Sequence, residues 1–408
     1  MTTVTQKIPS GYKQTEIGMI PADWRISSIN DLGTIIDGDR GSNYPNGDDF
    51  SEYGYCLFLN AKNVTKNGFR FEDVQFIKKE KDAVLSKGKL KRGDIVLTTR
   101  GTVGNIAFFD KDIPHENIRI NSGMVIIRID AINGVTPDYY HKLTQSNLLT
   151  NQIDRLVFGS AQPQLTVKSI ATFQFPVPTQ KNEQKSIVIT LSDADALIRK
   201  LEKLIEKKKN IKQGVMQELL TGKCRLSGFS GKWEVKKLGE LLDYEQPTKY
   251  LVKDTEYRDS YTTPVLTAGK TFILGYTNED AGIYKDLPVI IFDDFTTATK
   301  FVDFPFKAKS SAMKMLKPRN KDINLRFVFE KMQMIDFKLG DHKRYWISEY
   351  QNIEIDTPKP DEQKAISNVL SDMDSEIEKL ESQLTKYQNI KQGMMQTLLT
   401  GKIRLLTK

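Results

Sequence analysis

The sequence predicts an α+β protein in which two α+β domains alternate with two long helices that pair as an antiparallel coiled coil, in a pseudo-twofold, cyclic order. A segment of 44 residues occurs twice without a gap, at 183–226 and 362–405, and 27 of its aligned positions are identical. Each copy has the apolar spacing of a helix. The stretches outside the copies contain short β-rich runs and turns. The repeat is therefore a duplicated structural unit that frames two globular domains.

Each copy of the repeat is expected to form one helix of about 38 residues. Apolar residues recur at alternating steps of three and four, which is the seam of a coiled coil. We expect Asn182 and Asp361 to be N-caps, and Gly222 and Gly401 to follow the last turns. The seam residues are Ile187, Leu191, Ile198, Leu201 and Ile205 in the first copy and Ile366, Leu370, Met373, Ile377, Leu380 and Leu384 in the second.

A simple dimerisation coil is an alternative explanation of the heptads. Sequence identity extends beyond them, however, through the Ile-Lys-Gln-Gly turn at 211–214 and the Leu-Leu-Thr-Gly-Lys ending at 219–223. A second surface that both copies present to a repeated partner would explain this sameness.

The composition bounds the class of protein. Sixty Lys and Arg against 52 Asp and Glu give a formal charge of +8, which fits an anionic partner but also an ordinary basic protein. Cys56 and Cys224 are far apart and near no histidine cluster, so we expect no metal site and a reducing compartment. No apolar run approaches the roughly 18 residues of a membrane span. We therefore expect a cytoplasmic protein without a membrane partner.

The repeat sets the expected boundaries. They are an N-terminal arm at 1–16, a first domain at 17–181, a first helix at 182–226, a second domain at 227–360 and a second helix at 361–408. In the first domain, strands are expected within 55–64, 93–109, 123–129 and 171–178 and a helix over 137–157; in the second, strands within 263–277, 287–304 and 310–318 and a helix over 324–337. Trp24 and Trp233 mark corresponding starts.

The two domains differ most in two polar loops each. The segments 93–104 and 158–166 of the first domain correspond to 287–299 and 339–346 of the second. A shared scaffold with unlike polar loops suits two readers of different targets, although ordinary solvated turns have the same composition. The candidate DNA-binding residues are Thr98, Thr99, Arg100, Thr102, Asn105, Ser160, Gln162 and Gln164 in the first domain and Lys270, Asp294, Thr296, Thr297, Lys300, His342, Lys343, Arg344 and Tyr345 in the second.

This order of two dissimilar domains and two near-identical helices, each helix opened by Glu-Gln and closed by Leu-Leu-Thr-Gly-Lys, resembles the specificity subunit of a type I restriction-modification system. The loop Arg100–Gly104 and the segment Gly159–Gln164 match patterns common in the family's target recognition domains. The second domain departs from those patterns at both places.

The resemblance implies that the chain is a non-catalytic DNA-recognition and scaffold subunit. Each domain would read one half of an asymmetric bipartite target in double-stranded DNA, and the helices would set the gap. The implied partners are two modification subunits, which methylate adenine with S-adenosylmethionine, and restriction subunits, which translocate and cut with ATP and Mg²⁺. No cofactor is expected on this chain itself.

The residues agree with an absence of catalysis. There is no Asn-Pro-Pro or Asp-Pro-Pro methyltransferase tetrapeptide, no Gly-rich nucleotide fingerprint and no phosphate loop. Among the histidines, His141 falls on a predicted helix, where packing is the expected role. Two rival functions remain compatible with the sequence: an autonomous DNA-binding regulator or anti-restriction factor, and a coiled-coil adaptor without a nucleic-acid role.

Overall fold

The computed structural model describes residues 8–157, 163–269, 271–339 and 344–406. The chain divides into two compact units. Unit 1 holds residues 1–200 and 384–408, and unit 2 holds residues 201–383. Each unit thus combines one α+β domain with the beginning of one long helix and the end of the other, which confirms the predicted cyclic order.

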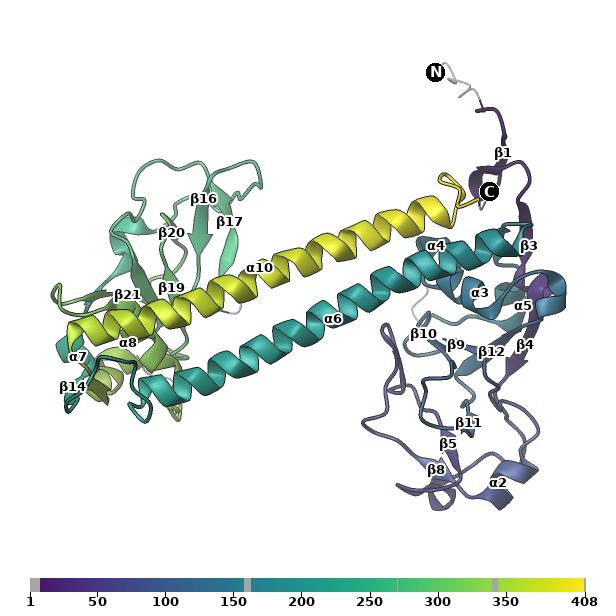
Figure 1. Cartoon of the computed structure of the whole chain (residues 1–408), viewed down its shortest axis with the longest axis horizontal. Helices are drawn as coiled ribbons and strands as arrows, with labels where there is room; N and C mark the ends of the chain where they lie inside the picture. Colours follow the sequence, from purple (N-terminus) through teal and green to yellow (C-terminus); the bar gives the residue numbers. More distant parts are fainter. Residues whose placement is uncertain (1–7, 158–162, 270, 340–343, 407–408) are drawn as a thin grey trace. The chain divides into compact units, whose positions relative to one another are not determined.

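The domain of unit 1 is built on a four-stranded antiparallel sheet (Figure 1). The order is β10 (Ile106–Phe108), β9 (Ile95–Thr98), β12 (Met124–Ile129) and β4 (Gly33–Asp37). A smaller sheet contains β11 (Ile118–Arg119), β5 (Cys56–Phe58) and β8 (Phe76–Ile77). The remaining strands pair as β1 (Tyr12–Thr15) with β2 (Gly18–Pro21), β3 (Arg25–Ser28) with β13 (Gln174–Val177), and β6 (Val64–Thr65) with β7 (Gly68–Phe69).

The helices of this domain are short. They are α1 (Ile29–Leu32), α2 (Lys79–Val84), α3 (Pro137–Thr144), α4 (Asn147–Val157) and α5 (Val167–Ala171). The prediction of a single helix over 137–157 is wrong, because the helix is interrupted at Gln145 and Ser146. There the Ser146 hydroxyl donates to the carbonyl of Leu143. The predicted arm is also too long, since Tyr12–Thr15 forms a hairpin with β2.

The domain of unit 2 repeats this plan. Its four-stranded sheet has the order β15 (Leu242–Glu245), β21 (Met313–Pro318), β18 (Val289–Asp293) and β19 (Thr299–Val302). The smaller sheet contains β17 (Ile273–Thr277), β16 (Thr263–Leu266) and β20 (Lys307–Ala308), and β14 (Glu234–Lys237) pairs with β22 (Glu354–Thr357). The helices are α7 (Leu238–Leu241), α8 (Leu325–Gln333) and α9 (Tyr345–Ser348). The predicted kinship of the two domains is confirmed by this shared strand order.

The two long helices are α6 (Lys181–Leu220) and α10 (Pro360–Leu398). Asn182 and Asp361 lie inside them, so the predicted N-caps are wrong; Pro360 itself occupies the first turn, where a missing N–H costs nothing. Gly222 and Gly401 both have a φ of 71°, the left-handed conformation expected after a helix end.

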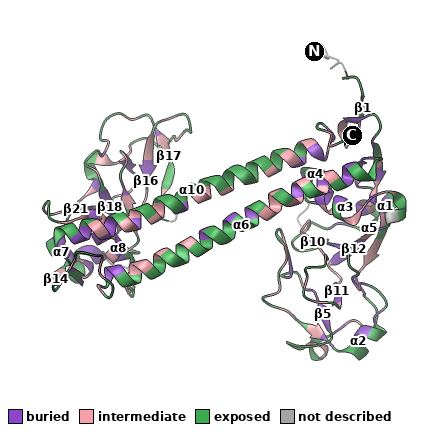
Figure 2. Cartoon of the chain, viewed as in Figure 1, coloured by how far each residue is buried: buried purple, intermediate pink, exposed green. Residues whose placement is uncertain are grey.

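Within each unit the two helices run side by side in opposite directions (Figure 1). In unit 2, Lys208 pairs with Glu376 at 2.7 Å and Lys212 with Asp374 at 2.6 Å. In unit 1, Lys391 pairs with Asp195. Buried residues form a stripe on otherwise exposed helices (Figure 2). The predicted seam lies on this stripe: Ile187, Leu191, Ile198, Leu201, Ile205, Ile366, Leu370 and Ile377 are buried, and Met373, Leu380 and Leu384 are half-buried.

The repeated Glu-Gln pair has a structural role at the start of each helix. The Gln184 side chain accepts from the backbone N–H of Thr136, the N-cap of α3, at 3.1 Å. Gln363 accepts from the N–H of Asn324, the N-cap of α8, at 2.9 Å. Each glutamine thus fixes the first turn of a domain helix against the long helix.

Repeated aspartates clamp the pairing further along. Asp195 binds Lys391 of α10 and Lys142 of α3, the latter at 2.6 Å. The corresponding Asp374 binds Lys212 of α6 and Arg326 of α8. One carboxylate therefore joins the two long helices and the domain in each unit, which explains why both copies retain it.

Candidate nucleic-acid interface

In unit 1, the end of β9 leads into the loop that carries most of the predicted reading residues. The carbonyl of Thr99 accepts from the backbone N–H of Leu165 at 3.0 Å, and this bond joins the loop to the segment before α5. The two polar loops that differ most between the domains are therefore adjacent in this one. Gly101 and Gly104, with φ of 70° and 93°, make the turn between β9 and β10.

Thr98 and Thr99 hold this loop and do not face solvent. Both are buried, at 1% and 3% exposure. The Thr98 hydroxyl donates to the carbonyl of Thr102 and accepts from the N–H of Asn105, and the Thr99 hydroxyl donates to the carbonyl of Gly123 at 3.0 Å. Their hydroxyls are used inside the fold, so DNA contact by these two side chains stays a prediction.

Arg100 and Gln164 face solvent and lie together. With the amide oxygen of Gln164 turned toward Arg100, that oxygen accepts from Nε at 3.0 Å and from Nη2 at 2.9 Å. Both residues are exposed. Two candidates from different loops, 64 positions apart in the chain, are thus brought into one polar group.

Thr102 and Asn105 lie beside this group. Thr102 is exposed, and Asn105 is half-buried with its side-chain N–H donating to the carbonyl of Val64 at 2.9 Å. A surface pocket of about 650 Å³ opens here, lined by Thr65, Lys66, Asn67, Gly101, Thr102, Val103, Asn105, Ile153, Asp154, Val157 and Pro163. Its lining combines one lysine and one aspartate with polar Thr and Asn side chains and an apolar floor that includes Ile153 and Val157.

The sequence analysis missed Lys66 and Asn67, which belong to the turn between β6 and β7. The Asn67-Gly68 pair, flanked by Val64 and Phe69, is a hairpin signature that could have located the turn. It could not have shown that the turn lies beside Thr102.

In unit 2, the end of β18 is connected in the same way. The carbonyl of Asp294 accepts from the N–H of Tyr345 at 2.9 Å, in the place of the bond from Leu165 to Thr99. By this correspondence Phe295 stands at the position of Arg100, and Arg344 at that of Gln164. The two domains therefore share a backbone frame and present different side chains on it.

Asp294 and Tyr345 are parts of this frame. Asp294 is 2% exposed, pairs with the buried Lys314 at 3.2 Å and accepts from the N–H of Trp346 at 2.9 Å. Tyr345 is 2% exposed and its ring contacts Phe337 at 5.3 Å between centroids. Both side chains are packed inside the domain, so DNA contact by Asp294 and Tyr345 stays a prediction.

Other predicted residues of this domain do face solvent. Thr296, Lys300 and Arg344 are exposed, and Thr297 is half-buried with a φ of 57°, which is rare for a β-branched residue. Phe295 was missed by the sequence analysis and is 42% exposed. The remaining candidates, Ser160, Gln162, Lys270, His342 and Lys343, lie outside the described residues.

The histidines that the structure describes have packing roles. His141 stacks on Phe108 at 4.5 Å between ring centroids, and burial lowers its pKa to about 3, which keeps the ring neutral. This confirms the packing role predicted for it. His115 meets Phe71 edge to face at 4.9 Å. Among the described residues no cluster of three His, Cys, Asp or Glu could hold a metal ion, and none of the helices there is long and apolar enough to cross a membrane.

Both domains match a known protein family. A family model described as the type I restriction modification DNA specificity domain matches residues 21–213 and 230–387. The specificity subunit of the type I restriction enzyme EcoR124I/EcoR124II of Escherichia coli is 58% identical over 142 residues, which is 33% of this chain and 34% of that protein. A relative from Methanocaldococcus jannaschii, named for the type I restriction enzyme MjaX, is 24% identical over 97% of both chains.

The fold is similar to a solved structure over almost its whole length. The S subunit of a type I restriction-modification system from M. genitalium has a TM-score of 0.63, with 15% identity over 97% of this chain and 98% of that one. At this identity the likeness concerns the fold alone.

Proposed function

Because the chain belongs to the type I restriction modification DNA specificity family, we propose that it is the subunit that recognises the DNA target in a type I restriction-modification complex. Each of its two domains reads one half of an asymmetric bipartite sequence in double-stranded DNA. The chain performs no catalysis; adenine methylation, translocation and cleavage belong to its partner subunits.

One observation carries this proposal: equivalent backbone bonds hold unlike side chains in the two domains. The bond from Leu165 to Thr99 presents Arg100 and Gln164 in the first, and the bond from Tyr345 to Asp294 presents Arg344 and Phe295 in the second. Arginine, glutamine and apolar side chains are the groups that distinguish base edges in the major groove. A common frame with different readers gives two different half-sites.

Lysines around these groups supply phosphate contacts. Lys66 lines the pocket beside Thr102, and Lys300 is exposed on β19. Such contacts fix position on the duplex and carry no sequence information themselves. The net charge of +8 on the chain is consistent with such contacts to an anionic partner.

The long helices dock the modification subunits, one on each copy of the repeat. Ile211 of α6 and Ile390 of α10, which correspond in the repeat, are both 43% exposed. One turn on, a Cβ built on Gly214 or Gly393 would meet no atom within 4 Å. A glycine inside a helix costs about 1 kcal/mol relative to alanine, so a closely approaching partner is a reason to keep one in both copies.

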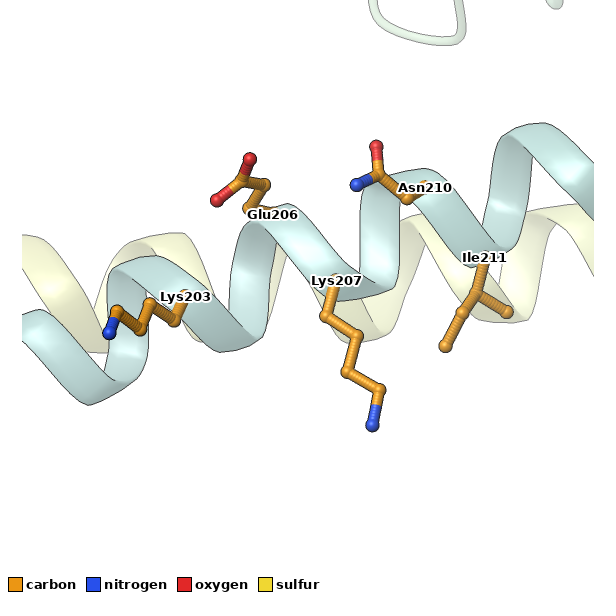
Figure 3. Close-up of a pocket in the computed structure, with 5 residues that line it drawn as sticks. All are labelled: Lys203, Glu206, Lys207, Asn210 and Ile211. Carbon is orange, nitrogen blue, oxygen red and sulfur yellow. The ribbon is translucent and has the colours of Figure 1, made fainter.

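On α6 this docking face extends back along the helix. Lys203, Glu206, Lys207, Asn210 and Ile211 line a shallow depression of about 440 Å³. Figure 3 shows that Lys207 and Ile211, one turn apart, project from the same side of α6. An exposed isoleucine ringed by charged residues has the character of an interface core with a polar rim.

S-adenosylmethionine, ATP and Mg²⁺ act on the partner subunits in this proposal, and the chain acts in the cytoplasm, where the DNA is. The experiment is methylome sequencing of a host that carries the gene together with its modification subunit. Methylated adenines in one bipartite motif would support the proposal. The absence of any methylated motif would contradict it. The chain purified alone is expected to transfer no methyl group and to hydrolyse no ATP.

The docking face has its own test. Replacement of Gly214 and Gly393 by Trp places bulk in open space, so the thermal midpoint should remain within a few degrees of the parent, while co-purification with the modification subunit is lost. Replacement of both by Ala should preserve the complex. Assembly of the Trp variant at the parental level would contradict docking at this face.

A further inference from the structure

We propose that one arginine reads a guanine in each half-site and that the two arginines come from opposite loops: Arg100, braced by Gln164, from the loop after β9, and Arg344 from the segment before α9. This inference rests on the proposed function and names the base that the site recognises.

The Arg100 guanidinium has one edge bound to Gln164 and a second edge that points elsewhere. A guanidinium has five N–H donors in a rigid plane. Gln164 occupies the edge formed by Nε and Nη2, with one oxygen at 3.0 and 2.9 Å. The other edge, with parallel N–H bonds from Nη1 and Nη2, stays on the side away from Gln164. That edge matches the O6 and N7 acceptors of guanine in the major groove.

Gln164 positions Arg100 and does not itself read a base. Alone, an exposed glutamine would be a reader of adenine through its amide. Here its oxygen already accepts two bonds from Arg100, so it lacks the free acceptor that bidentate contact with adenine needs. Gln164 is therefore a positioning residue: it holds the long arginine side chain in one orientation and lowers the entropy cost of binding.

In the second domain the arginine comes from the other of the two loops. Phe295 stands where Arg100 stands in the first domain, and Arg344 stands where Gln164 stands, since Tyr345 donates to Asp294 as Leu165 donates to Thr99. Arg344 and Phe295 are both exposed. The second domain thus also presents one arginine at the junction of the two loops, from the other side of the frame.

The consequence is a defined pattern in the target. Each half-site contains a guanine whose identity depends on one arginine. The apolar Phe295, which follows the Asp294 bonded to Tyr345, suits the C5-methyl group of a thymine in the second half-site only. The halves share one requirement and differ in what surrounds it.

The test uses the complete complex with the modification subunits and a DNA library in which each base pair of the target is varied. Replacement of Arg100 by Ala should reduce discrimination at one G·C pair of the first half-site by about 5- to 150-fold and leave the second half-site unchanged. Replacement of Arg344 by Ala should do the same at one G·C pair of the second half-site.

Two variants of Gln164 separate positioning from reading. Gln164→Glu keeps an oxygen acceptor for Arg100 and should retain the guanine preference, whereas Gln164→Leu should weaken it. If the Gln164 amide itself read the base, Glu and Leu would fail alike. The thermal midpoints of all variants should match the parent, because the altered side chains are exposed.

The outcomes distinguish this inference from the proposed function. Sequence-specific methylation that persists in the Arg100 and Arg344 variants with every base preference unchanged would overturn the guanine assignment and leave the recognition role intact. Loss of preference at an A·T pair would also overturn it. Methylation by the parent complex without any bipartite motif would instead contradict the proposed function.

Discussion

Arg404 binds the carboxylate of Glu183 through Nε and Nη2, the latter at 2.9 Å. It thereby joins the segment that follows α10 to the first turn of α6. It also reaches both oxygens of Asp23 at 2.9 Å. These carboxylates raise the pKa of the Arg404 guanidinium further above its usual value, so it stays charged. In unit 2, Arg225 binds the corresponding Glu362, with Nη2 at 2.6 Å.

The two clasps differ in their further contacts. Arg225 also donates to the carbonyl of Gly231 at 2.8 Å, whereas Arg404 binds a second carboxylate, that of Asp23. The tail around Arg404 is held by its side chains and by the Tyr12 hydroxyl, which donates to the carbonyl of Gly401 at 3.1 Å. Proximity of the N-terminal segment to the C-terminal tail, which the cyclic order predicted, is thereby confirmed within unit 1.

Replacement of Arg404 by Met should open the tail. The variant leaves Glu183, 1% exposed, with only the indole N–H of Trp24 as a charge-stabilising donor among these contacts, at a cost of about 1–3 kcal/mol. Hydrogen exchange of residues 399–406 should accelerate. Arg225→Met, which breaks the corresponding bond to Glu362 in unit 2, is the matched control and should leave the exchange of residues 399–406 unchanged. Equal exchange in parent and Arg404→Met would show that apolar contacts alone hold the tail.

Removal of Asp294 should destabilise unit 2 strongly. Asp294→Ala leaves the ammonium of Lys314, 1% exposed, without its carboxylate, and breaking such a buried pair costs about 3–5 kcal/mol. Urea denaturation followed by Trp fluorescence measures the loss. Asp243→Ala, which breaks an exposed pair with Arg319 in the same unit, is the control and should cost at most about 1 kcal/mol. A change below about 1 kcal/mol for Asp294→Ala would show that the pair with Lys314 contributes no more than an exposed one.

Asp39 gives unit 1 a defined acid dependence. Backbone N–H bonds from Gly41, Ser86 and Lys87 lower the pKa of Asp39 from its ordinary 3.8 to about 2. Since the folded pKa is the lower one, this stabilisation is complete above about pH 4 and is lost as the pH falls toward about 2. The difference in unfolding free energy between the parent and Asp39→Asn should therefore be constant from about pH 7 to 5 and shrink below about pH 4. A difference that does not vary with pH down to about 2.5 would contradict the shift.

The paired helices are expected to set the distance between the half-sites. One extra turn of four residues after Leu201 and another after Leu380 would lengthen the pair by about 6 Å. DNA rises about 3.4 Å per base pair, so the gap should grow by one or two pairs. The insertion also shifts the seam, which the coil must absorb by local unwinding.

Methylome sequencing measures the result of that insertion. We expect either the same half-sites with a longer gap, or a folded variant that no longer binds, because two base pairs also rotate the second half-site by roughly 70°. An active variant that still methylates sites with the original gap would show that these helices are not the ruler.

The sequence was informative wherever a pattern repeats. The duplicated copies predicted both long helices and their pairing, because a stripe such as Ile187, Leu191 and Ile198 requires a partner of the same kind, and the family resemblance supplied the antiparallel direction. The strands were predicted from β-branched runs, as for β9 and β18. Helix ends were less accurate, since Asn182 and Asp361 are the second residues of helices that begin at Lys181 and Pro360.

The polar loops were predicted in place but not in orientation. Thr98, Thr99 and Asp294 end buried strands, and the sequence does not show whether a hydroxyl or carboxylate there turns outward or binds the backbone behind it. Nor does it show that Arg100 meets Gln164, because that contact depends on the single backbone bond between Thr99 and Leu165. Pairings between distant loops are a property of the folded sheet.

The clasp at Arg404 also determines how the chain responds to mechanical load. Because the Tyr12 hydroxyl contacts Gly401 and Arg404 binds Asp23, a force applied between residues 12 and 404 acts on these attachments before it acts on the sheets. The tail should peel away in a short step, at roughly 3.5 Å per residue released, while the domain and the start of α6 remain folded. These contacts between the N-terminal hairpin and the C-terminal tail should therefore yield first, before the sheets of the domain are disturbed.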